Sequence, residues 1–232
     1  MSMSKDERNE ILELYKDLRV ADVRDGMDWN MMHNYGSMSH EIRPLFRTRA
    51  VGIARTARYV RFQGQMPKMT FEEYDEWSSY YYREVCNYPW VDEIEEGDFI
   101  VIDQSGVDAG LMGSNNSLAC VKSGAVGFVT EGGVRDTDEI IIQKIPFWSR
   151  FISQGMVQGR LQFESMNCSV NVGGVVVNPG DVVAADGDGI IVVPRKMAFS
   201  VAKYAQRELN SDKGSRRKLY EDLGMELDKT VL

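Results

Sequence analysis

The sequence predicts an α/β fold, a single domain over residues 1–232 with flanking helices near both ends. A β-branched run at 99–102, a helical segment at 114–123 and an apolar run at 126–129 indicate a parallel β-α-β unit. The segment 169–194 has three β-branched runs separated by turn residues, which predicts a compact β-meander. Apolar residues at helical spacing near both termini predict the flanking helices.

The chain begins with two predicted amphipathic helices, at 5–18 and more weakly at 20–27. The apolar positions of the first are Ile11, Leu12, Leu14, Tyr15 and Leu18. Between 41 and 62, Pro44 and the alternating apolar residues that follow it predict a turn and then a strand. The sheet is therefore expected to begin in this segment.

Residues 71–90 predict a helix with an aromatic stripe. Its apolar side chains recur every three to four residues, at Phe71, Tyr74, Trp77, Tyr81 and Val85. Such a stripe suits an aromatic platform for a sugar or a base, but packing into the core or against a partner subunit is its commoner use. We interpret the stripe as a packing surface.

The β-α-β unit leads to a polar segment. Its first strand is expected to end near Asp103, and its helix ends before Gly124, where a left-handed residue costs little. After the second strand, residues 131–136 read EGGVRD and are predicted to form the turn at its carboxyl end. Ligands favour such ends of parallel strands. Asp103 and Asp108 lie in this neighbourhood, and we assign neither a role.

The C-terminal part combines turns and helices. Residues 186–189, DGDG, superficially resemble a metal loop, but no glutamate follows at EF-hand spacing, so we interpret them as a turn between strands. Helical spacing at 196–209 and 216–223 predicts two helices, interrupted by the polar stretch 211–215 with its glycine.

Composition restricts the function classes. The formal net charge is −8, which argues against a nucleic-acid binder because phosphate neutralisation needs a surplus of cations. The basic cluster at 213–218 is interpreted as a solvated helix face because Glu221 and Asp222 adjoin it. Three widely spaced cysteines form neither a disulfide framework nor a CxxC metal site. Binding of a small molecule is the favoured function class.

Neither the N-terminal residues nor the two histidines predict a further function. Residues 1–9 are polar and charged, and no apolar run approaches the roughly 18 residues of a membrane span, so we expect a cytoplasmic protein without membrane contact. His33 and His40 are the only histidines and fall in a polar loop. We therefore expect neither a histidine-based zinc site nor a Ser-His-Asp triad.

Four residues of the EGGVRD segment suit the binding of an organic anion and a cation. Gly132 and Gly133 would let backbone N–H groups face a ligand closely, because they lack Cβ atoms. Arg135 offers a planar, permanently charged fork that matches a carboxylate. Asp136 supplies a hard anionic oxygen. An Arg-Asp pair after glycines is also commonly a local ion pair or a helix N-cap, and the residues alone leave that alternative open.

A single carboxylate is a usual protein ligand for Mg²⁺ or Mn²⁺, which retain several waters. Such a cation polarises a keto oxygen and stabilises the enolate left when a C–C bond breaks. The predicted chemistry is therefore that of an aldolase or a decarboxylase.

Three segments resemble the RraA-like family, which includes 4-hydroxy-4-methyl-2-oxoglutarate/4-carboxy-4-hydroxy-2-oxoadipate aldolases. The segment from Gly113 to Ile140, GSNNSLACVKSGAVGFVTEGGVRDTDEI, looks like its central motif, and VNVGGVVVNPGDVVAADGDGIIVVP resembles its β-rich signature. VADVRDGMD and EIRPLF are similar to its N-terminal region. The resemblance covers roughly residues 18–195 and leaves 196–232 as a helical extension. It implies a layered, swivelling-domain-like β/β/α domain with flanking helices, assembled as a homotrimer or homohexamer.

The resemblance also implies roles for single residues. In family aldolases the arginine of this pair binds the keto-acid carboxylate and the aspartate ligates the metal, so Arg135 and Asp136 are the expected catalytic residues. The implied activity is a class II-type lyase that cleaves a 4-hydroxy-2-oxo acid to pyruvate or a related keto acid, with oxaloacetate decarboxylation as a side activity. In the family's ribonuclease regulators the aspartate is commonly absent, so its presence favours an enzyme.

One segment departs from the family pattern. Family aldolases usually have an acidic residue after the glycine that corresponds to Gly113, whereas this chain has Ser114, Asn115 and Asn116. These four residues are expected to contact the substrate through backbone amides at a helix N-terminus and through side-chain amides that suit a hydroxylated, sugar-acid-like substrate. Because Ser114 cannot replace the missing charge, a non-enzymatic regulator that binds a ribonuclease or another protein is the alternative function.

Overall fold

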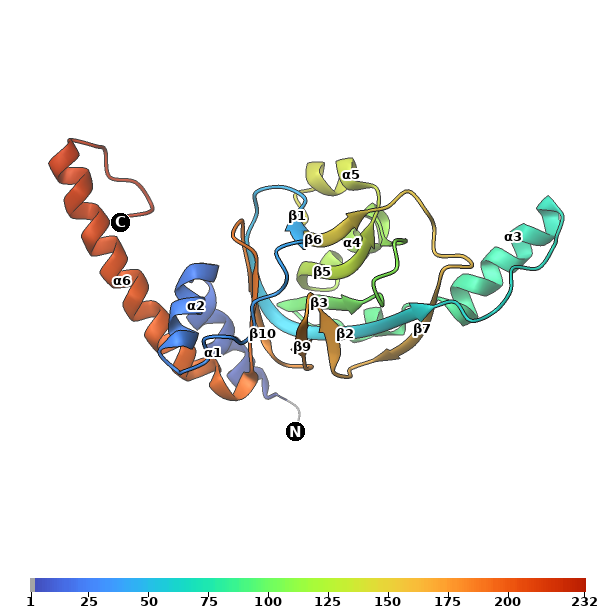
Figure 1. Cartoon of the computed structure of the whole chain (residues 1–232), viewed down its shortest axis with the longest axis horizontal. Helices are drawn as coiled ribbons and strands as arrows, with labels where there is room; N and C mark the ends of the chain where they lie inside the picture. Colours follow the sequence, from blue (N-terminus) through green and yellow to red (C-terminus); the bar gives the residue numbers. More distant parts are fainter. Residues whose placement is uncertain (1–2) are drawn as a thin grey trace.

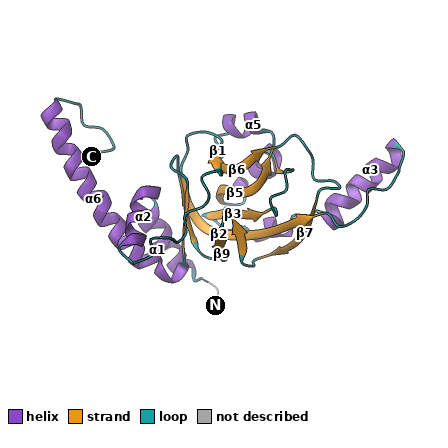
Figure 2. Cartoon of the chain, viewed as in Figure 1, coloured by secondary structure: helices purple, strands orange, loops and turns teal. Residues whose placement is uncertain are grey.

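The computed structural model describes residues 3–232 and has an α/β fold built on a nine-stranded mixed sheet (Figures 1 and 2). The strand order is β1-β6-β5-β3-β2-β10-β11, with β4 beside β5 and β7 beside β2. The strands of this sheet are β1 (Arg43–Pro44), β2 (Ala50–Arg61), β3 (Asp98–Asp103), β4 (Gly110–Met112), β5 (Ala125–Val134), β6 (Phe147–Ile152), β7 (Leu161–Met166), β10 (Val182–Ala185) and β11 (Ile190–Val193). A second sheet holds β8 (Val170–Val172) and β9 (Val175–Val177).

Helices cover the sheet and both of its ends (Figure 1). They are α1 (Lys5–Tyr15), α2 (Val20–Asp28), α3 (Phe71–Tyr80), α4 (Ser114–Lys122), α5 (Thr137–Ile142) and α6 (Ala198–Leu223). Shorter turns are a π-helical turn η1 (Tyr81–Val85) and the 3-10 turns η2 (Pro89–Glu93) and η3 (Arg195–Met197). None of the helices among residues 3–232 has the length and apolar character needed to cross a bilayer.

The predicted β-α-β unit is confirmed. Strands β3 and β5 pair in parallel, and α4 connects them after the short strand β4. All six residues of β3 are buried, as expected for a parallel strand covered on both faces. Its side chains alternate: Ile100 and Ile102 pack in one core, and Phe99 and Val101 pack in another. The sheet is therefore the middle layer of the domain.

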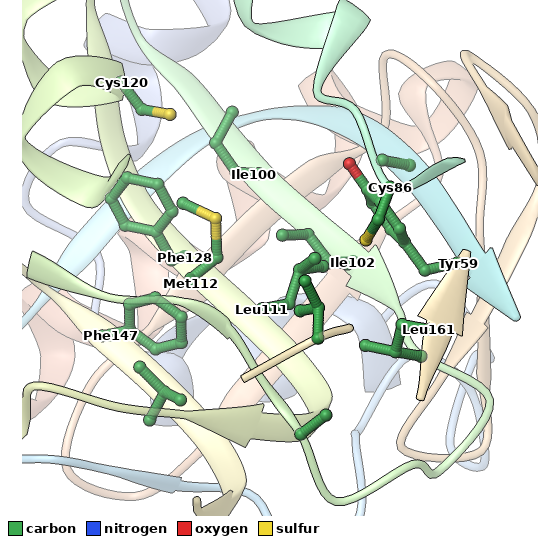
Figure 3. Packing of buried hydrophobic residues seen from close by; sticks show 14 of the residues in the cluster. Tyr59, Cys86, Ile100, Ile102, Leu111, Met112, Cys120, Phe128, Phe147 and Leu161 are labelled. Carbon is green, nitrogen blue, oxygen red and sulfur yellow. The ribbon is translucent and has the colours of Figure 1, made fainter. Parts of the chain in front are cut away.

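One core lies between the sheet and the helices α4 and α5. Figure 3 shows Ile100, Ile102 and Phe128 of the sheet converging with Cys120 of α4. Phe128 stacks on Phe147 of β6 with ring centroids 5.3 Å apart. The opposite face of the sheet packs against the β8-β9 hairpin. This β/β/α layering is the arrangement that the family resemblance implied.

The helices α1, α2 and α6 pack on β10 and β11 and form a third core. Gly26 permits the close approach of α2 to α6, since a Cβ there would lie 2.5 Å from the carbonyl oxygen of Val201. Asp186, in the predicted DGDG turn between β10 and β11, accepts a hydrogen bond from the Val20 N–H through Oδ2 at 2.9 Å. The turn prediction is confirmed, and this carboxylate binds the first residue of α2.

A buried carboxylate anchors the start of β3. Asp98 is 1% exposed and accepts hydrogen bonds from Arg8 at 2.8 Å and from Arg55 at 2.9 Å. It also accepts from the Glu95 N–H at 2.8 Å. The two guanidinium groups therefore join α1 and β2 to the amino end of the central strand.

Two predictions for the C-terminal third are wrong. The segment 169–194 is not one meander, because Gly173 and Gly174 have φ angles of +58° and +79° and reverse the chain into a separate β8-β9 hairpin. The predicted break at 211–215 is absent, and α6 runs unbroken through Gly214 to Leu223. A single glycine costs a helix about 1 kcal/mol. Here the C-terminal tail folds back onto the helix, with Thr230 accepting a hydrogen bond from Arg216 at 3.2 Å.

The aromatic helix is shorter than predicted and only its end is packed. It changes to the π-helical turn at Tyr81 and ends at Val85. Helix α3 itself has no buried residue, and Phe71 is 83% exposed, whereas Tyr81 is fully buried. In Figure 1, α3 extends away from the sheet, so packing into the core is confirmed for the end of the segment alone, and packing of the rest against a partner subunit stays a prediction.

Candidate functional site

The candidate site lies at the carboxyl end of β5, where the chain passes Val134 and enters α5. Strand β4 pairs in parallel with this end, and the N–H of Arg135 donates to the carbonyl of Met112 at 3.0 Å. Helix α4 begins two residues after β4. The structure therefore brings the two predicted site segments, 113–116 and 135–136, together.

The predicted role of Gly132 and Gly133 is wrong. Both are buried in β5, so the turn does not begin at Glu131, as predicted, but after Val134. A Cβ at Gly132 would lie 2.5 Å from the side-chain amide of Gln104, and one at Gly133 would lie 2.6 Å from Cβ of Ser153. These glycines permit close packing of the sheet instead of presenting amides to a ligand.

The aliphatic part of the Arg135 side chain is packed, whereas the side chain as a whole is partly exposed. Its methylene groups lie over Gly110, where a Cβ would be 2.7 Å from Cδ of the arginine. Nε donates to Oδ1 of Asp136 at 3.3 Å, and the side chain is 35% exposed. Within residues 3–232 its two terminal amino groups make no hydrogen bond. They can therefore bind a carboxylate in two-point fashion.

Asp136 lies at the N-terminus of α4, although it is the N-cap residue of α5. Its φ of +54° is left-handed, a conformation that aspartate tolerates better than most residues. Oδ2 accepts from the Ser114 N–H at 3.2 Å, and the side chain caps nothing in α5. At 36% exposed, the carboxylate faces solvent beside Arg135. The side chain therefore does not cap its own helix, whereas the other alternative, a local ion pair between Arg135 and Asp136, is confirmed at 3.3 Å and is partly exposed.

The second predicted segment, residues 113–116, lies at the start of α4 beside Asp136. Gly113 is buried against the aspartate, since a Cβ there would lie 3.2 Å from Cγ of Asp136 and closer still to its Oδ2. Ser114 is half-buried, and Asn115 and Asn116 are exposed on the first turn of α4. The Asn116 amide is directed to the Leu111 carbonyl at 3.5 Å. Gly113 and Ser114 thus contact Asp136, and the roles of Asn115 and Asn116 stay a prediction.

One tyrosine of the aromatic segment, Tyr88, also lies in this neighbourhood. The Tyr88 hydroxyl donates to the Leu111 carbonyl at 2.9 Å, beside Asn116. Burial raises the pKa of Tyr82, and the positive charge of Arg135 partly opposes that shift. The sequence predicted an aromatic stripe on one helix face, and Tyr82 falls off that stripe.

A cavity elsewhere in the domain is less suitable for binding a substrate. The cavity of about 610 Å³ lined by Arg8, Arg55 and Asp98 lies at the amino end of β3, the opposite end of the parallel strands. Its buried cations are already paired with Asp98. Among residues 3–232 there is no group of three or more His, Cys, Asp or Glu side chains arranged to hold a metal. A cation at Asp136 would therefore have at most two such side chains as ligands among these residues.

Residues 20–192 match the family model described as "RraA-like: Aldolase/RraA". The chain belongs to the RraA-like family. Both site segments fall inside the matched region.

Curated relatives match more distantly and only in part. Protein DlpA of Legionella pneumophila is 28% identical over 45% of this RraA-like chain and 17% of its own length. A protein of Halalkalibacterium halodurans named "Putative 4-hydroxy-4-methyl-2-oxoglutarate aldolase" is 26% identical over 56% of this chain and 62% of its own. A relative of the same name from Cupriavidus necator is 33% identical over 44% of this chain and 62% of its own. The chain thus spans less than two thirds of these relatives.

Solved structures confirm the RraA-like fold. An uncharacterized protein from Pseudomonas syringae superposes with a TM-score of 0.73 at 24% identity, covering 97% of this chain and 98% of its own. Streptomyces coelicolor RraAS2, described as an unusual member of the RNase ES inhibitor RraA protein family, has a TM-score of 0.70 at 23% identity, with coverages of 89% and 96%.

Proposed function

We propose that this RraA-like protein is a divalent-metal-dependent lyase that cleaves a 4-hydroxy-2-oxo acid or a related keto acid and releases pyruvate or a similar product. The observation that supports it most is the partly exposed Arg135–Asp136 pair, in which the two terminal amino groups of the arginine make no hydrogen bond to residues 3–232 and lie next to a partly exposed carboxylate. The names of the aldolase relatives agree with this activity.

The residues present fit a hard divalent cation. Both carboxylate oxygens of Asp136 accept one long hydrogen bond each, at 3.2 and 3.3 Å, which leaves lone pairs free on both. An oxygen ligand of this kind suits Mg²⁺ or Mn²⁺, with water and substrate completing the coordination. When bound, the cation supplies the positive charge that polarises the keto oxygen and stabilises the developing enolate.

The chain's own residues bind and orient the substrate. Arg135 holds the carboxylate of the keto acid by two hydrogen bonds and so fixes the direction of the keto group. The N–H groups of Asn115 and Asn116 are in the first turn of α4 and are open to an oxygen atom of the substrate. Ser114 carries no charge, so proton transfer depends on water or on a group outside Gly113 to Asn116.

The test is Mg²⁺-dependent product release from a panel of hydroxylated and simple 2-keto acids. We expect Asp136→Ala to lower the activity by about 100-fold or more, since it removes a charge that acts at the reacting centre. Asp138→Ala is the matched control, because Asp138 is exposed on α5 two residues away. Equal activity of the two variants would contradict the assignment of Asp136.

A non-enzymatic regulator remains the second candidate, favoured by the uncharged Ser114 and by the structural similarity to RraAS2. We propose a ribonuclease or another protein as its partner. No turnover of any keto acid, together with a stable complex with such a partner, would support this function against the lyase.

A further inference from the structure

A fully buried amide side chain connects β5 to the loop that leads into β4. Gln104 follows β3 and is 0% exposed. Its side chain lies across Gly132 of β5, where an added Cβ would be 2.5 Å from Cδ of the glutamine. Oε1 accepts a hydrogen bond from Oγ1 of Thr130 at 2.7 Å, and Nε2 donates to the Ala109 carbonyl at 3.0 Å. A buried amide costs stability unless it is hydrogen-bonded, so this side chain needs both partners.

The hydrogen-bond partners fix the orientation of the Gln104 amide. A backbone carbonyl can only accept, so the amide nitrogen must be the atom that faces Ala109. The amide oxygen is therefore directed to Thr130, whose hydroxyl must donate its one proton to it. Oγ1 of Thr130 also accepts from the Gly132 N–H at 3.0 Å, which holds the hydroxyl on its own strand. The amide thus joins β5 to the Ala109 carbonyl.

That carbonyl closes the turn on which the Arg135 side chain lies. It accepts a second hydrogen bond, from the Leu111 N–H at 3.0 Å, and the resulting turn encloses Gly110. The methylene groups of Arg135 pack on this glycine, since an added Cβ would lie 2.7 Å from both Cγ and Cδ of the arginine. The position of the arginine stem therefore depends on the Ala109 carbonyl, which the buried amide holds.

We propose that Gln104 is a positioning residue, whose amide fixes the turn at Gly110 and thereby directs the Arg135 guanidinium group to the carboxylate of the substrate. The proposal rests on the proposed function for the role of Arg135. An apolar side chain of similar size would fill the same space but would leave the turn without the hydrogen bond that ties it to β5. A satisfied polar network specifies one arrangement of the groups that it joins, whereas apolar packing tolerates several.

Binding of oxamate, an unreactive analogue of a 2-keto acid, tests the proposal without requiring turnover. Its dissociation constant is measured by ligand-observed NMR with Mg²⁺ present, and the unfolding midpoint is measured in parallel. We expect Gln104→Met to raise the dissociation constant about threefold to tenfold, the equivalent of one hydrogen bond. Arg135→Met should weaken binding at least as much. Thr56→Val is the matched control, because Thr56 is also 0% exposed and donates to the Cys168 carbonyl at 2.6 Å. It should lower stability and leave oxamate binding unchanged.

Gln104→Glu supplies a readout that a loss of stability would not produce. A protonated carboxyl group has the shape of the amide and can donate to the backbone carbonyl while accepting from the threonine hydroxyl. Burial raises the pKa of such a group, and its ionised form repels the carbonyl. The ratio of the variant to the wild-type dissociation constant should therefore be near one at about pH 5 and exceed about threefold at about pH 9. Titration of Asp103, Glu131 and Asp136 affects both proteins and so cancels in the ratio. Because its protonated form keeps both hydrogen bonds, this variant also serves where Gln104→Met fails to fold.

The outcomes separate this inference from the lyase. Wild-type affinity in Gln104→Met, a Gln104→Glu ratio that does not change with pH, or an equal loss of affinity in Thr56→Val overturns the proposal. Absence of oxamate binding, or binding that Arg135→Met leaves unchanged, overturns it together with the role given to Arg135. Affinity that depends on Gln104 and Arg135 without turnover of any keto acid supports this inference and contradicts the lyase. Turnover with wild-type oxamate affinity in Gln104→Met contradicts this inference alone.

Discussion

Replacement of Gly113 by alanine tests whether the position of Asp136 matters for the proposed activity. The backbone at Gly113 has φ −137° and ψ −173°, an extended conformation that alanine adopts without strain. The added Cβ would lie 3.2 Å from Cγ of Asp136 and would overlap its Oδ2, so the carboxylate must move by roughly 1 Å. A misplacement of that size costs about 100-fold in rate, or about 2.7 kcal/mol of transition-state stabilisation.

The assay is kcat/KM for Mg²⁺-dependent product release, with the unfolding midpoint measured in parallel. Overpacking should cost about 1–3 kcal/mol of stability, so the variant remains folded. Gly214→Ala is the control: no atom lies within 4 Å of its added Cβ, and it should leave the rate unchanged while stabilising α6. Wild-type kcat/KM in Gly113→Ala would refute the requirement for a fixed carboxylate.

Two further predictions concern stability. Burial, followed by the charge of Asp103, raises the pKa of Glu131 above 4.5, so its ionised form destabilises the folded state at neutral pH and its protonated form does not. Glu131→Gln should therefore raise the unfolding midpoint at pH 7, with a gain that disappears as the pH falls below 4.5; a gain that persists in acid would contradict this cause. Asp98→Ala should cost about 3–5 kcal/mol in urea unfolding, because it removes the buried carboxylate that pairs with both Arg8 and Arg55. Glu95→Ala, on the same cluster but 66% exposed, should change stability by less than about 1 kcal/mol, and equal losses would refute the argument.

The order of the central elements could be predicted from the sequence because it depends on local periodicity. The run at 99–102 and the helix from Ser114 gave the right elements and the right parallel arrangement. The DGDG turn was also predicted correctly, since its glycines and aspartates determine the chain reversal without distant partners. The extent of β5 was not predicted correctly. Glycines in a strand cannot be distinguished from glycines in a turn until their neighbours are known.

Errors at the periphery have the same cause. The break in α6 was predicted from the polar residues 211–215, which stay mostly exposed on a continuous helix, and the C-terminal tail contacts this part of α6 through Lys213 and Arg216. The aromatic helix was assigned one continuous face, and the π-helical turn at Tyr81 changes which side chain meets the core. The contact between the C-terminal tail and α6 and the π-helical turn at Tyr81 both lack a repeating sequence pattern, so neither could be predicted from the sequence.

The sequence by itself determined which side chains can bind an anion and a hard cation, because charge and geometry belong to arginine and aspartate wherever they lie. It also placed them after a strand, at an end where ligands bind. Only the tertiary structure decided that the Asp136 carboxylate faces the start of α4 and that Gly132 and Gly133 serve packing. These features depend on contacts between segments far apart in the chain, which exist only once the layers have packed.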